Sequence, residues 1–386
     1  MLEALIDKFA RIEDPRCDWR VEHKLLDILV IAVCAVIGEA ESFEDIALYG
    51  RCKRDWLGRL LELPGGIPSH DTFRRVPMLI DPERFERCFL AWVRSVFRPD
   101  ADAPRQIAID GRTVRRSFDR RNGRSPLPLV SAFAVEHGLV LAQRATDAKR
   151  GELTVLPDLL DGLDLRGCLV SLDALACRPA IAARITARGG DYLLALKGNR
   201  KKAHAGVKRW FEANAFSLGG SLRPCFDAFD ESHGRLVRRR VFACTELGSW
   251  AVLQRWPGST TVLAVENIRG INGSGKVTAE IRCYLSSSRL PLTQLATAIR
   301  SHWAVENGLH WVLDVGFNED AGRVREPNAA RNLALLRKIA LNFARADTTP
   351  KASLKGKRKS AVLSGLAPAG IACAGLKRVC GQAAFK

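Results

Sequence analysis

Apolar positions recur at helical spacing through the first quarter of the chain. Residues 25–40 are apolar on nearly every side, a pattern typical of a buried helix. Residues 42–63 open with Ser42, followed three residues later by an acid, and continue with a helical period. Pro82 stands in the first turn of a third periodic stretch, where its missing N–H costs nothing. We therefore expect a helical N-terminal domain over residues 1–98.

From Arg105 the pattern changes to apolar strands and short amphipathic helices. Strands are expected at 105–116, 127–138, 139–148, 167–177 and 191–199, and helices at 151–165 and 178–190. In this β-β-β-α-β-α-β order, three meandering strands precede right-handed crossovers, which gives a mixed sheet. This is the ribonuclease-H-like arrangement, in which the strand after the first crossover pairs beside the first strand. It would bring Asp110 next to Asp173.

The next stretch of the chain has a different pattern. Residues 204–288 are typical of β-structure with Gly, Asn and Ser turns, and helical spacing returns at about residue 289. The simplest account is an α/β core over residues 104–203 and 289–346, interrupted by a β-rich insertion at 204–288. The tail at 347–386 is basic and rich in Gly, Ala and Ser, so we expect it to be loosely ordered.

Composition indicates the kind of binding partner and the cellular compartment. The formal net charge of +18 favours binding to polyanions, of which nucleic acid is the usual one. None of the eleven cysteines forms a C-x-x-C pair, which favours reduced thiols over disulfides or structural zinc. The first residues carry acids where a signal peptide needs bases, and the apolar run 28–38 is too short to cross a bilayer. We expect a cytoplasmic protein that does not enter a membrane.

Two aspartates each follow an apolar strand. A carboxylate at such a position is costly to bury unless it binds a cation or an ion-pair partner. Asp110 and Asp173 on adjacent strands would form a site for Mg²⁺, which accepts one or two carboxylates together with phosphate oxygens and water. Glu306, from a following helix, is the candidate for a third carboxylate of a two-metal site that cleaves phosphodiesters. The alternative is that the aspartates cap turns at the strand ends.

The segment 301–315 spaces four polar residues at steps of four. A regular helix would stack His302, Glu306, His310 and Asp314 on one face. Such a stripe fits a zinc site, a catalytic carboxylate with helpers, or an ordinary polar helix face. The zinc pattern is incomplete, because helical zinc ligands lie at i and i+4 with a third ligand from elsewhere.

Basic residues recur close to these acids. They fall in four clusters at strand ends or in the insertion, namely Arg112, Arg115 and Arg116; Lys149 and Arg150; Lys197, Arg200, Lys201 and Lys202; and Arg235, Arg238, Arg239 and Arg240. One such cluster is usually a solvated face, but their recurrence favours DNA. Trp303 and Trp311 either anchor the core or stack on an unpaired base.

Several motifs occur together and in order over residues 14–345. They include "DPR", "GIPSHDTFRRV", "IAIDGRTVRRS", "LVSAFAVEHGLVLAQ", "VSLDALAC", "GGDYLLALKGN", "HGR" and "IRSHWAVENGLHWVLDVGFNED". In these motifs the chain resembles the DDE transposases of bacterial insertion sequences, in particular the ISAs-type group that includes the H-repeat-associated proteins.

This resemblance implies a triad of Asp110, Asp173 and Glu306 that binds two Mg²⁺ or Mn²⁺ ions. It implies cleavage at the terminal inverted repeats of an element and joining of the freed 3′-hydroxyl to target DNA. The partner would be double-stranded DNA, bound by a homodimer or higher oligomer at the nucleoid. Residues expected to bind DNA or to support the triad are Arg112, Arg115, Lys149, Glu152, Lys197, Asn199, His233, Arg235, Arg300, His302, Trp303, Asn307 and His310.

Two other hypotheses remain open at this point. The first is a DNA-binding protein that derives from such an enzyme and has lost catalysis. The second is a ribonuclease-H-like nuclease that hydrolyses DNA without strand transfer.

Overall fold

The computed structural model describes residues 1–17, 19, 21–96, 105–146, 151–217, 220–232, 235–248, 250–271, 277–347 and 352–363. The chain divides into two compact units. Unit 1 comprises Met1–Ala103, Gly111–Val155 and Glu306–Lys386, and unit 2 comprises Pro104–Asp110 and Leu156–Val305. Strand β1 (Arg105–Val114) therefore begins in unit 2 and ends in unit 1.

Helices make up most of unit 1. They are α1 (Leu2–Phe9), α2 (Leu25–Ile37), α3 (Phe43–Cys52), α4 (Arg54–Leu57), α5 (His70–Leu79), α6 (Pro82–Val96), α11 (Trp311–Phe317), α12 (Pro327–Ala346) and α13 (Leu354–Leu363). Ser42 and Asp45 cap α3 reciprocally, as the sequence pattern predicts. Helix α2 is buried along almost its whole length because only Asp27 among its thirteen residues is polar. None of the described helices combines the length and apolarity that a membrane crossing requires.

Helix α12 forms the centre of unit 1. It packs against α2, α5, α6 and strand β3 (Leu139–Ala145). Two buried asparagines of α12 form hydrogen bonds to backbone groups of these neighbours. Asn332 donates to Pro77 O and Ile80 O, and Asn342 bonds both the N–H and the carbonyl of Val140. These contacts hold α5 and the β2–β3 hairpin, which are far apart in sequence, against α12.

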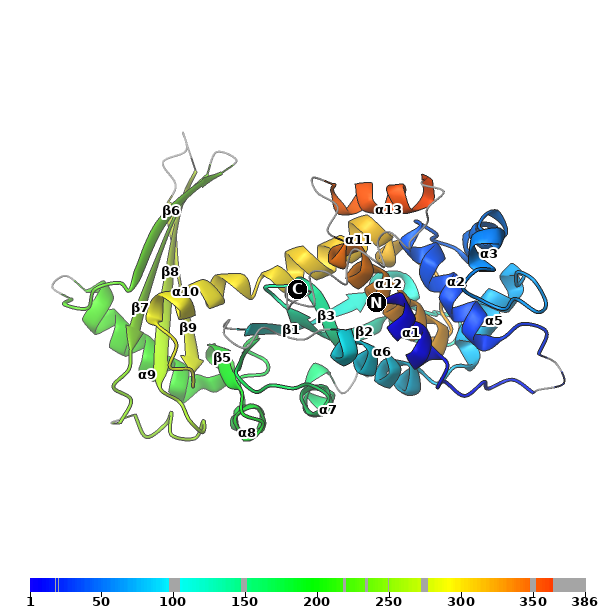
Figure 1. The fold of residues 1–386 in the computed structure, drawn as a ribbon. Helices are drawn as coiled ribbons and strands as arrows, with labels where there is room; N and C mark the ends of the chain where they lie inside the picture. Colours follow the sequence, from blue (N-terminus) through cyan, green and yellow to red (C-terminus); the bar gives the residue numbers. More distant parts are fainter. Residues whose placement is uncertain are drawn as a thin grey trace, which may run out of the picture. The chain divides into compact units, whose positions relative to one another are not determined.

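A mixed sheet of nine strands gives the protein its α/β architecture (Figure 1). The strands are hydrogen-bonded in the order β3-β2-β1-β4-β5-β9-β8-β7-β6. The remaining strands are β2 (Leu127–Ala134), β4 (Cys168–Leu172), β5 (Asp191–Leu196), β6 (Phe226–Ser232), β7 (Arg235–Cys244), β8 (Thr261–Ile271) and β9 (Val277–Ser286). Pairing is parallel between β1, β4 and β5, and antiparallel from β5 through β9 to β6. The mixed sheet predicted from sequence is confirmed.

Unit 2 also contains helices α7 (Leu156–Asp161), α8 (Pro179–Ala187), α9 (Lys201–Phe211) and α10 (Leu292–Ser301). Over residues 105–196 the strands and helices follow the predicted order. The prediction that β-structure begins at residue 204 is wrong, because α9 extends to Phe211. Ala203, Val207 and Phe211 form its buried stripe, which was hidden among the lysines and arginines of the same segment.

Two further segments differ from the sequence-based picture. Strands β6 to β9 continue the main sheet, because β9 pairs with β5 from Leu193↔Ser286 to Leu196↔Cys283. Part of the tail expected to be loosely ordered forms α13, whose Arg358 side chain is buried and donates to Val36 O and Ile37 O at the end of α2. A buried arginine with backbone acceptors accounts for order in this basic segment.

A buried ion cluster links α6, β3 and α12 within unit 1. Glu86 lies 3.2 Å from Arg144 and 3.4 Å from Arg331, and its side chain is 1% exposed. Desolvation raises the pKa of Glu86, while the two guanidinium groups oppose that shift. Lys338 is also fully buried and donates to Gln143 Oε1 at 2.6 Å. Because these charges are removed from water, the stability of the fold depends on each one keeping its ion-pair or hydrogen-bond partner.

Replacing Glu86 by Ala should therefore lower the free energy of unfolding by about 3–5 kcal/mol, since it leaves two arginines partly buried without their carboxylate. Urea denaturation measures this loss. Glu83→Ala, at an exposed position on the same helix, is the matched control and should change stability by less than about 1 kcal/mol. Equal effects of the two variants would contradict the assigned role of Glu86.

His310 is packed into unit 1 near two cations. Burial, with Arg112 and Lys338 nearby, lowers its pKa to about 3. Its charged form is disfavoured in the folded protein, so between about pH 6.5 and pH 3 only the unfolded chain takes up this proton. This group therefore makes the protein lose stability as the pH falls, by at most about 1.4 kcal/mol per pH unit.

His310→Asn should flatten the dependence of unfolding free energy on pH between pH 6 and pH 5. The measurement is urea denaturation at both pH values. His70→Asn, at an exposed position, keeps His310 and should keep the slope of the unsubstituted protein. A slope that survives in His310→Asn would mean that other groups cause it.

Candidate functional site

The register of β1 and β4 brings two acids together within unit 2. Ile109 is the last residue of β1 paired with β4, opposite Leu172, and Asp110 and Asp173 are the next residues of the two parallel chains. Asp110 is half-buried and Asp173 is exposed. One oxygen of Asp173, Oδ1, accepts from the N–H groups of Leu175 at 3.0 Å and Ala176 at 3.3 Å, which orients the carboxylate at the strand end.

A chain of buried polar groups lies beneath this pair. Gln106 Nε2 donates to Ser171 Oγ and to Ala298 O, both at 2.8 Å, and Ser171 Oγ lies 3.0 Å from His302 Nδ1. These bonds tie the end of α10 to β1 and β4. Burial lowers the pKa of His302, and the charge of Asp173 opposes that shift. His302 is thus a neutral residue that fixes α10 close to Asp173.

The expected stripe of four polar residues on one helix face is wrong. After α10 ends at Ser301, residues Val305–His310 form a π-helical turn, in which the wider i→i+5 period takes side chains four apart out of line. Glu306 and Asn307 are exposed on this turn, which belongs to unit 1 from Glu306 onward. Asp314, on α11, pairs instead with Arg112 at 2.5 Å.

Among the described residues, no three His, Cys, Asp or Glu side chains are grouped so that they could hold a metal ion. This holds for Asp110, Asp173 and Glu306 as well: the register of β1 and β4 brings the two aspartates together, whereas Glu306 belongs to unit 1. Zinc bound by the polar residues of the 302–314 segment therefore has no support in the structure. The paired Asp110 and Asp173 fit the chemistry of a hard divalent cation, since Mg²⁺ is commonly held by one or two carboxylates plus waters and substrate oxygens.

Arg112 has a different environment from the one that the sequence suggested. Its side chain is 7% exposed, lies within 3.4 Å of Asp314, Glu319 and Asp320, and donates to His310 O. Arg115 is exposed and pairs with Asp320 at 3.2 Å. The charge of Arg112 is thus neutralised inside unit 1.

Glu152 lies against the glycine that follows Asp110. A Cβ at Gly111 would stand 2.0 Å from Glu152 Oε1, so the carboxylate occupies the space that any side chain there would need. The pairing of Gly111 with Glu152 could not be inferred from the sequence, because a glycine gives no sign of what packs against it.

The loop after β5 is tied to the loop that follows Asp173. Asn199 donates to Ala174 O at 2.6 Å, and Arg200 donates to Cys177 O at 2.7 Å. Lys197, at the end of β5, is exposed. These hydrogen bonds hold the loop that follows Lys197 against the loop that follows Asp173 in unit 2.

The other predicted DNA contacts are dispersed. Arg300 is exposed and pairs with Asp230 at 3.0 Å, and Arg282 lies over the ring of the partly exposed Trp303. Arg238, Arg239 and Arg240 bond Asp227, Asn267 and Glu266, so most of the basic run in β7 has partners in the sheet. Lys149, His233 and the side chain of Arg235 lie outside the described residues.

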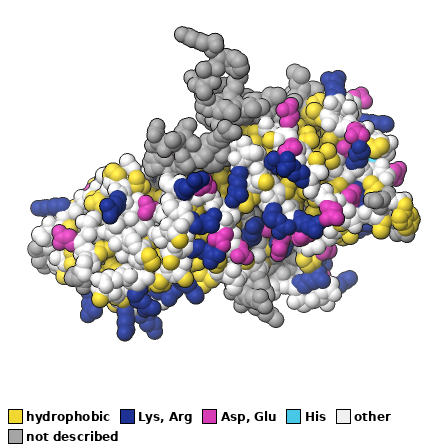
Figure 2. All heavy atoms as spheres, turned by 60° about the horizontal axis from the view of Figure 1, so that its bottom comes forward, with side chains coloured by type: hydrophobic (Ala, Val, Ile, Leu, Met, Phe, Trp, Pro, Cys, Tyr) yellow, Lys and Arg dark blue, Asp and Glu magenta, His cyan; other side chains and the backbone are white. Residues whose placement is uncertain are grey.

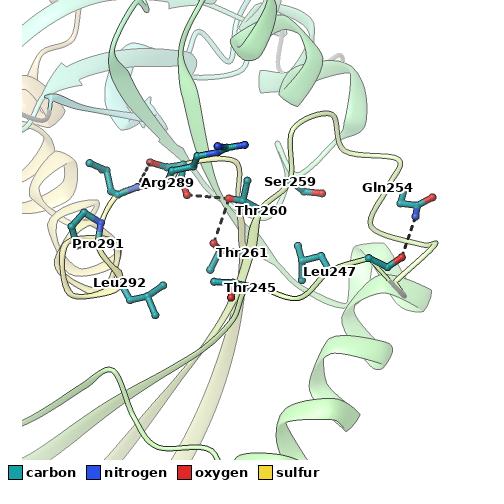
Figure 3. A pocket seen from close by; sticks show the side chains of 12 residues that line it. Thr245, Leu247, Gln254, Ser259, Thr260, Thr261, Arg289, Pro291 and Leu292 are labelled. Atoms are coloured by element: carbon teal, nitrogen blue, oxygen red, sulfur yellow. Dashed lines mark hydrogen bonds between the residues drawn. The ribbon is translucent and has the colours of Figure 1, made fainter.

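Two hollows lie away from the aspartates. One, of about 660 Å³, is lined by hydroxyl groups such as those of Ser259, Thr260 and Thr261, by Arg289, and by apolar side chains including Leu247 and Leu292 (Figure 3). Thr260 Oγ1 already donates there to Ser288 O at 3.0 Å, and no carboxylate lines the hollow. It therefore lacks the groups for acid–base or metal chemistry.

The second hollow is a basic groove of about 760 Å³ along α1 and α6. Its charged lining comprises Lys8, Arg11, Arg84, Arg87 and Arg94 with a single carboxylate, Glu13. Figure 2 shows Lys and Arg side chains gathered on one face of the molecule, with Asp and Glu between them. The sequence did not single out this groove, because its cations come from two helices whose pairing had to be known first.

Comparison with known proteins shows the family to which this chain belongs. A family model described as "Transposase DDE domain" matches residues 102–343, and one described as "DDE_Tnp_1-associated" matches residues 6–93. The "H repeat-associated putative transposase YhhI" of Escherichia coli K12 is 38% identical over 94% of this chain and 96% of its own length. The "Putative transposase YncI" of Escherichia coli O157:H7 is 37% identical over 94% of this chain and 93% of its own length.

Among solved structures, a piggyBac transposase synaptic complex with hairpin DNA aligns with 99% of this chain and 79% of its own, at 10% identity and a TM-score of 0.44. The first family model covers more than half of the chain, and the two relatives match nearly all of it. This chain therefore belongs to the family of DDE transposases.

Proposed function

We propose that this transposase cleaves and joins DNA at a metal site formed by Asp110, Asp173 and Glu306, within a ribonuclease-H-like core over residues 104–203 and 289–346. The observation that carries the proposal is the parallel register that ends in Asp110 and Asp173. Carboxylates on adjacent strand ends are suited to a divalent cation, and a third acid completes the ligands of a two-metal site.

Two short connections support Glu306 as the third acid. His302 bonds Ser171, two residues before Asp173, and Glu306 follows His302 by only four residues. Asp110 and Arg112 point to the same face of β1 because strand side chains alternate, and Arg112 donates to His310 O, four residues after Glu306. Ser171, two residues before Asp173, therefore contacts the chain just before Glu306, and Arg112, two residues after Asp110, contacts the chain just after it.

Bound Mg²⁺ or Mn²⁺ would supply an activated water and stabilise charge on the leaving oxygen. The three carboxylates would hold and orient the ions, and the neutral His302 would keep the helix before Glu306 on the sheet. Hydrolysis at the terminal inverted repeats would free a 3′-hydroxyl, which then attacks target DNA.

DNA is the partner that fits the basic groove of α1 and α6. Phosphate binding to Lys and Arg gains affinity through counterion release. The groove presents five such residues, of which Lys8 and Arg11 pair with Asp7 and Arg84 pairs with Glu13, while Arg87 is exposed. We assign recognition of DNA ends to the helical residues 1–98, and further DNA contacts to Arg115, Lys197 and the β-rich segment 204–288. The protein would act at the nucleoid as a dimer or higher oligomer.

The catalytic proposal is tested with Asp110→Asn, Asp173→Asn and Glu306→Gln. Each should abolish Mg²⁺- or Mn²⁺-dependent cleavage of DNA that carries the terminal repeats, because each removes one anionic ligand. Binding, measured by gel shift, should persist. Asp158→Asn, an exposed acid on α7, is the control and should cleave like the unsubstituted protein.

Three results would change the proposed function. Cleavage in all three variants would refute the triad. Binding by the unsubstituted protein without any cleavage would identify a DNA-binding protein that has lost catalysis, and nicked DNA without joined products would identify a nuclease.

The groove proposal is tested with Arg87→Ala. Removing one phosphate contact should weaken DNA binding and reduce the slope of log affinity against log salt by about 0.9. Arg166→Ala removes an exposed arginine of unit 2 that pairs with Asp164, and should leave that slope unchanged. Fluorescence anisotropy at several salt concentrations measures both. An unchanged slope in Arg87→Ala would place the DNA elsewhere.

A further inference from the structure

We propose that Arg345 is a positioning residue for catalysis: its guanidinium holds the π-helical turn that presents Glu306. The proposal rests on the role of Glu306 in the proposed function. Arg345 lies in the last turn of α12, far from Glu306 in sequence, and nothing in its local pattern marks it.

The turn needs hydrogen-bond donors from outside. In a π-helical turn the regular i→i+4 ladder is interrupted, so some carbonyl groups lose their usual N–H partners. Arg345 Nη2 donates to Gly308 O, two residues after Glu306, and its Nη1 donates to Gly138 O in the turn between β2 and β3. One planar guanidinium thus joins the π-helical turn to the hairpin.

Close packing reinforces this attachment. The guanidinium carbon of Arg345 lies 5.2 Å from the centre of the Phe133 ring, on β2. A Cβ at Gly308 would stand 3.3 Å from Phe133 Cζ, so the absence of a side chain allows the turn to approach the ring. Burial lowers the pKa of Arg345 to about 10, which leaves the guanidinium charged at neutral pH.

Two other arginines form hydrogen bonds to backbone carbonyl groups that follow Gly308 in the chain. Arg112 donates to His310 O and pairs with Asp314, and Arg358 donates to Gly316 O. These contacts fix one side of the segment, whereas Glu306, Asn307 and Trp311 are exposed on it. The segment is therefore anchored through its backbone and free to present Glu306.

Among these three arginines, Arg345 is the one best suited to a test. Arg112 also neutralises three carboxylates, and Arg358 also caps α2. The other contacts of Arg345, to Gly138 O and the Phe133 ring, go to the β2–β3 hairpin, which Asn342 also bonds, so a variant of Asn342 can control for their loss. Loss of Arg345 releases the carbonyl of Gly308 and lets the Glu306 carboxylate move. A misplaced ligand weakens metal binding and slows the chemical step.

The test compares the full-length protein with Arg345→Gln, Arg345→Lys and Asn342→Ala. Asn342 lies one turn earlier on α12, and its side-chain hydrogen bonds go to Val140 on the hairpin, so it controls for loosened packing. In single-turnover cleavage, Arg345→Gln should raise the half-saturating Mn²⁺ concentration about 10- to 100-fold, with unchanged DNA affinity. Arg345→Lys should recover part of this loss, because an ammonium group can still donate to one carbonyl.

A purely structural role predicts a different result. Arg345→Gln would then lower the amplitude of cleavage, as Asn342→Ala does, with an unchanged half-saturating Mn²⁺ concentration, and this result would overturn the proposal. Hydrogen exchange gives a readout that needs no catalysis. Amides of residues 305–311 should exchange faster in Arg345→Gln than in Asn342→Ala; equal exchange would overturn the proposal even if the unsubstituted protein does not cleave DNA.

Discussion

Parallel pairing of β1 with β4 is the constraint on which the site depends. Because Ile109 is opposite Leu172, the next residues of both strands, Asp110 and Asp173, follow that pair side by side. In the proposed function, this register gives a divalent ion two carboxylate ligands from adjacent strands. The buried Gln106 and Ser171 keep that register and connect it to α10.

The strands that carry the aspartates could be predicted because their apolar runs are short and end in single acids. Burial and pairing partners could not be predicted in the same way. Arg112 follows Asp110 and has the charge expected of a DNA contact, yet it is enclosed by Asp314, Glu319 and Asp320. The π-helical turn at Val305–His310 was also unpredictable, since the contacts to it, such as the hydrogen bond from Arg345 to Gly308 O, come from segments far away in sequence.

The positively charged residues therefore fall into two groups, buried ones that stabilise the fold and exposed ones. Arg358 and Lys338 are buried and Arg345 largely so, and all three bond backbone carbonyls or a side-chain amide of unit 1. Among the cations that the structure describes, exposed ones such as Arg87 in the α1 and α6 groove can reach phosphate groups. Net charge correctly indicated a nucleic-acid partner but overstated the number of residues that can meet it.

Metal binding by Asp110 and Asp173 is measured most directly as Mn²⁺ binding to the protein–DNA complex, followed by electron paramagnetic resonance. The unsubstituted protein should bind Mn²⁺ saturably, and the double variant Asp110→Asn/Asp173→Asn should lose this binding with DNA still bound. Equal Mn²⁺ binding by the two proteins would contradict a metal site at the ends of β1 and β4.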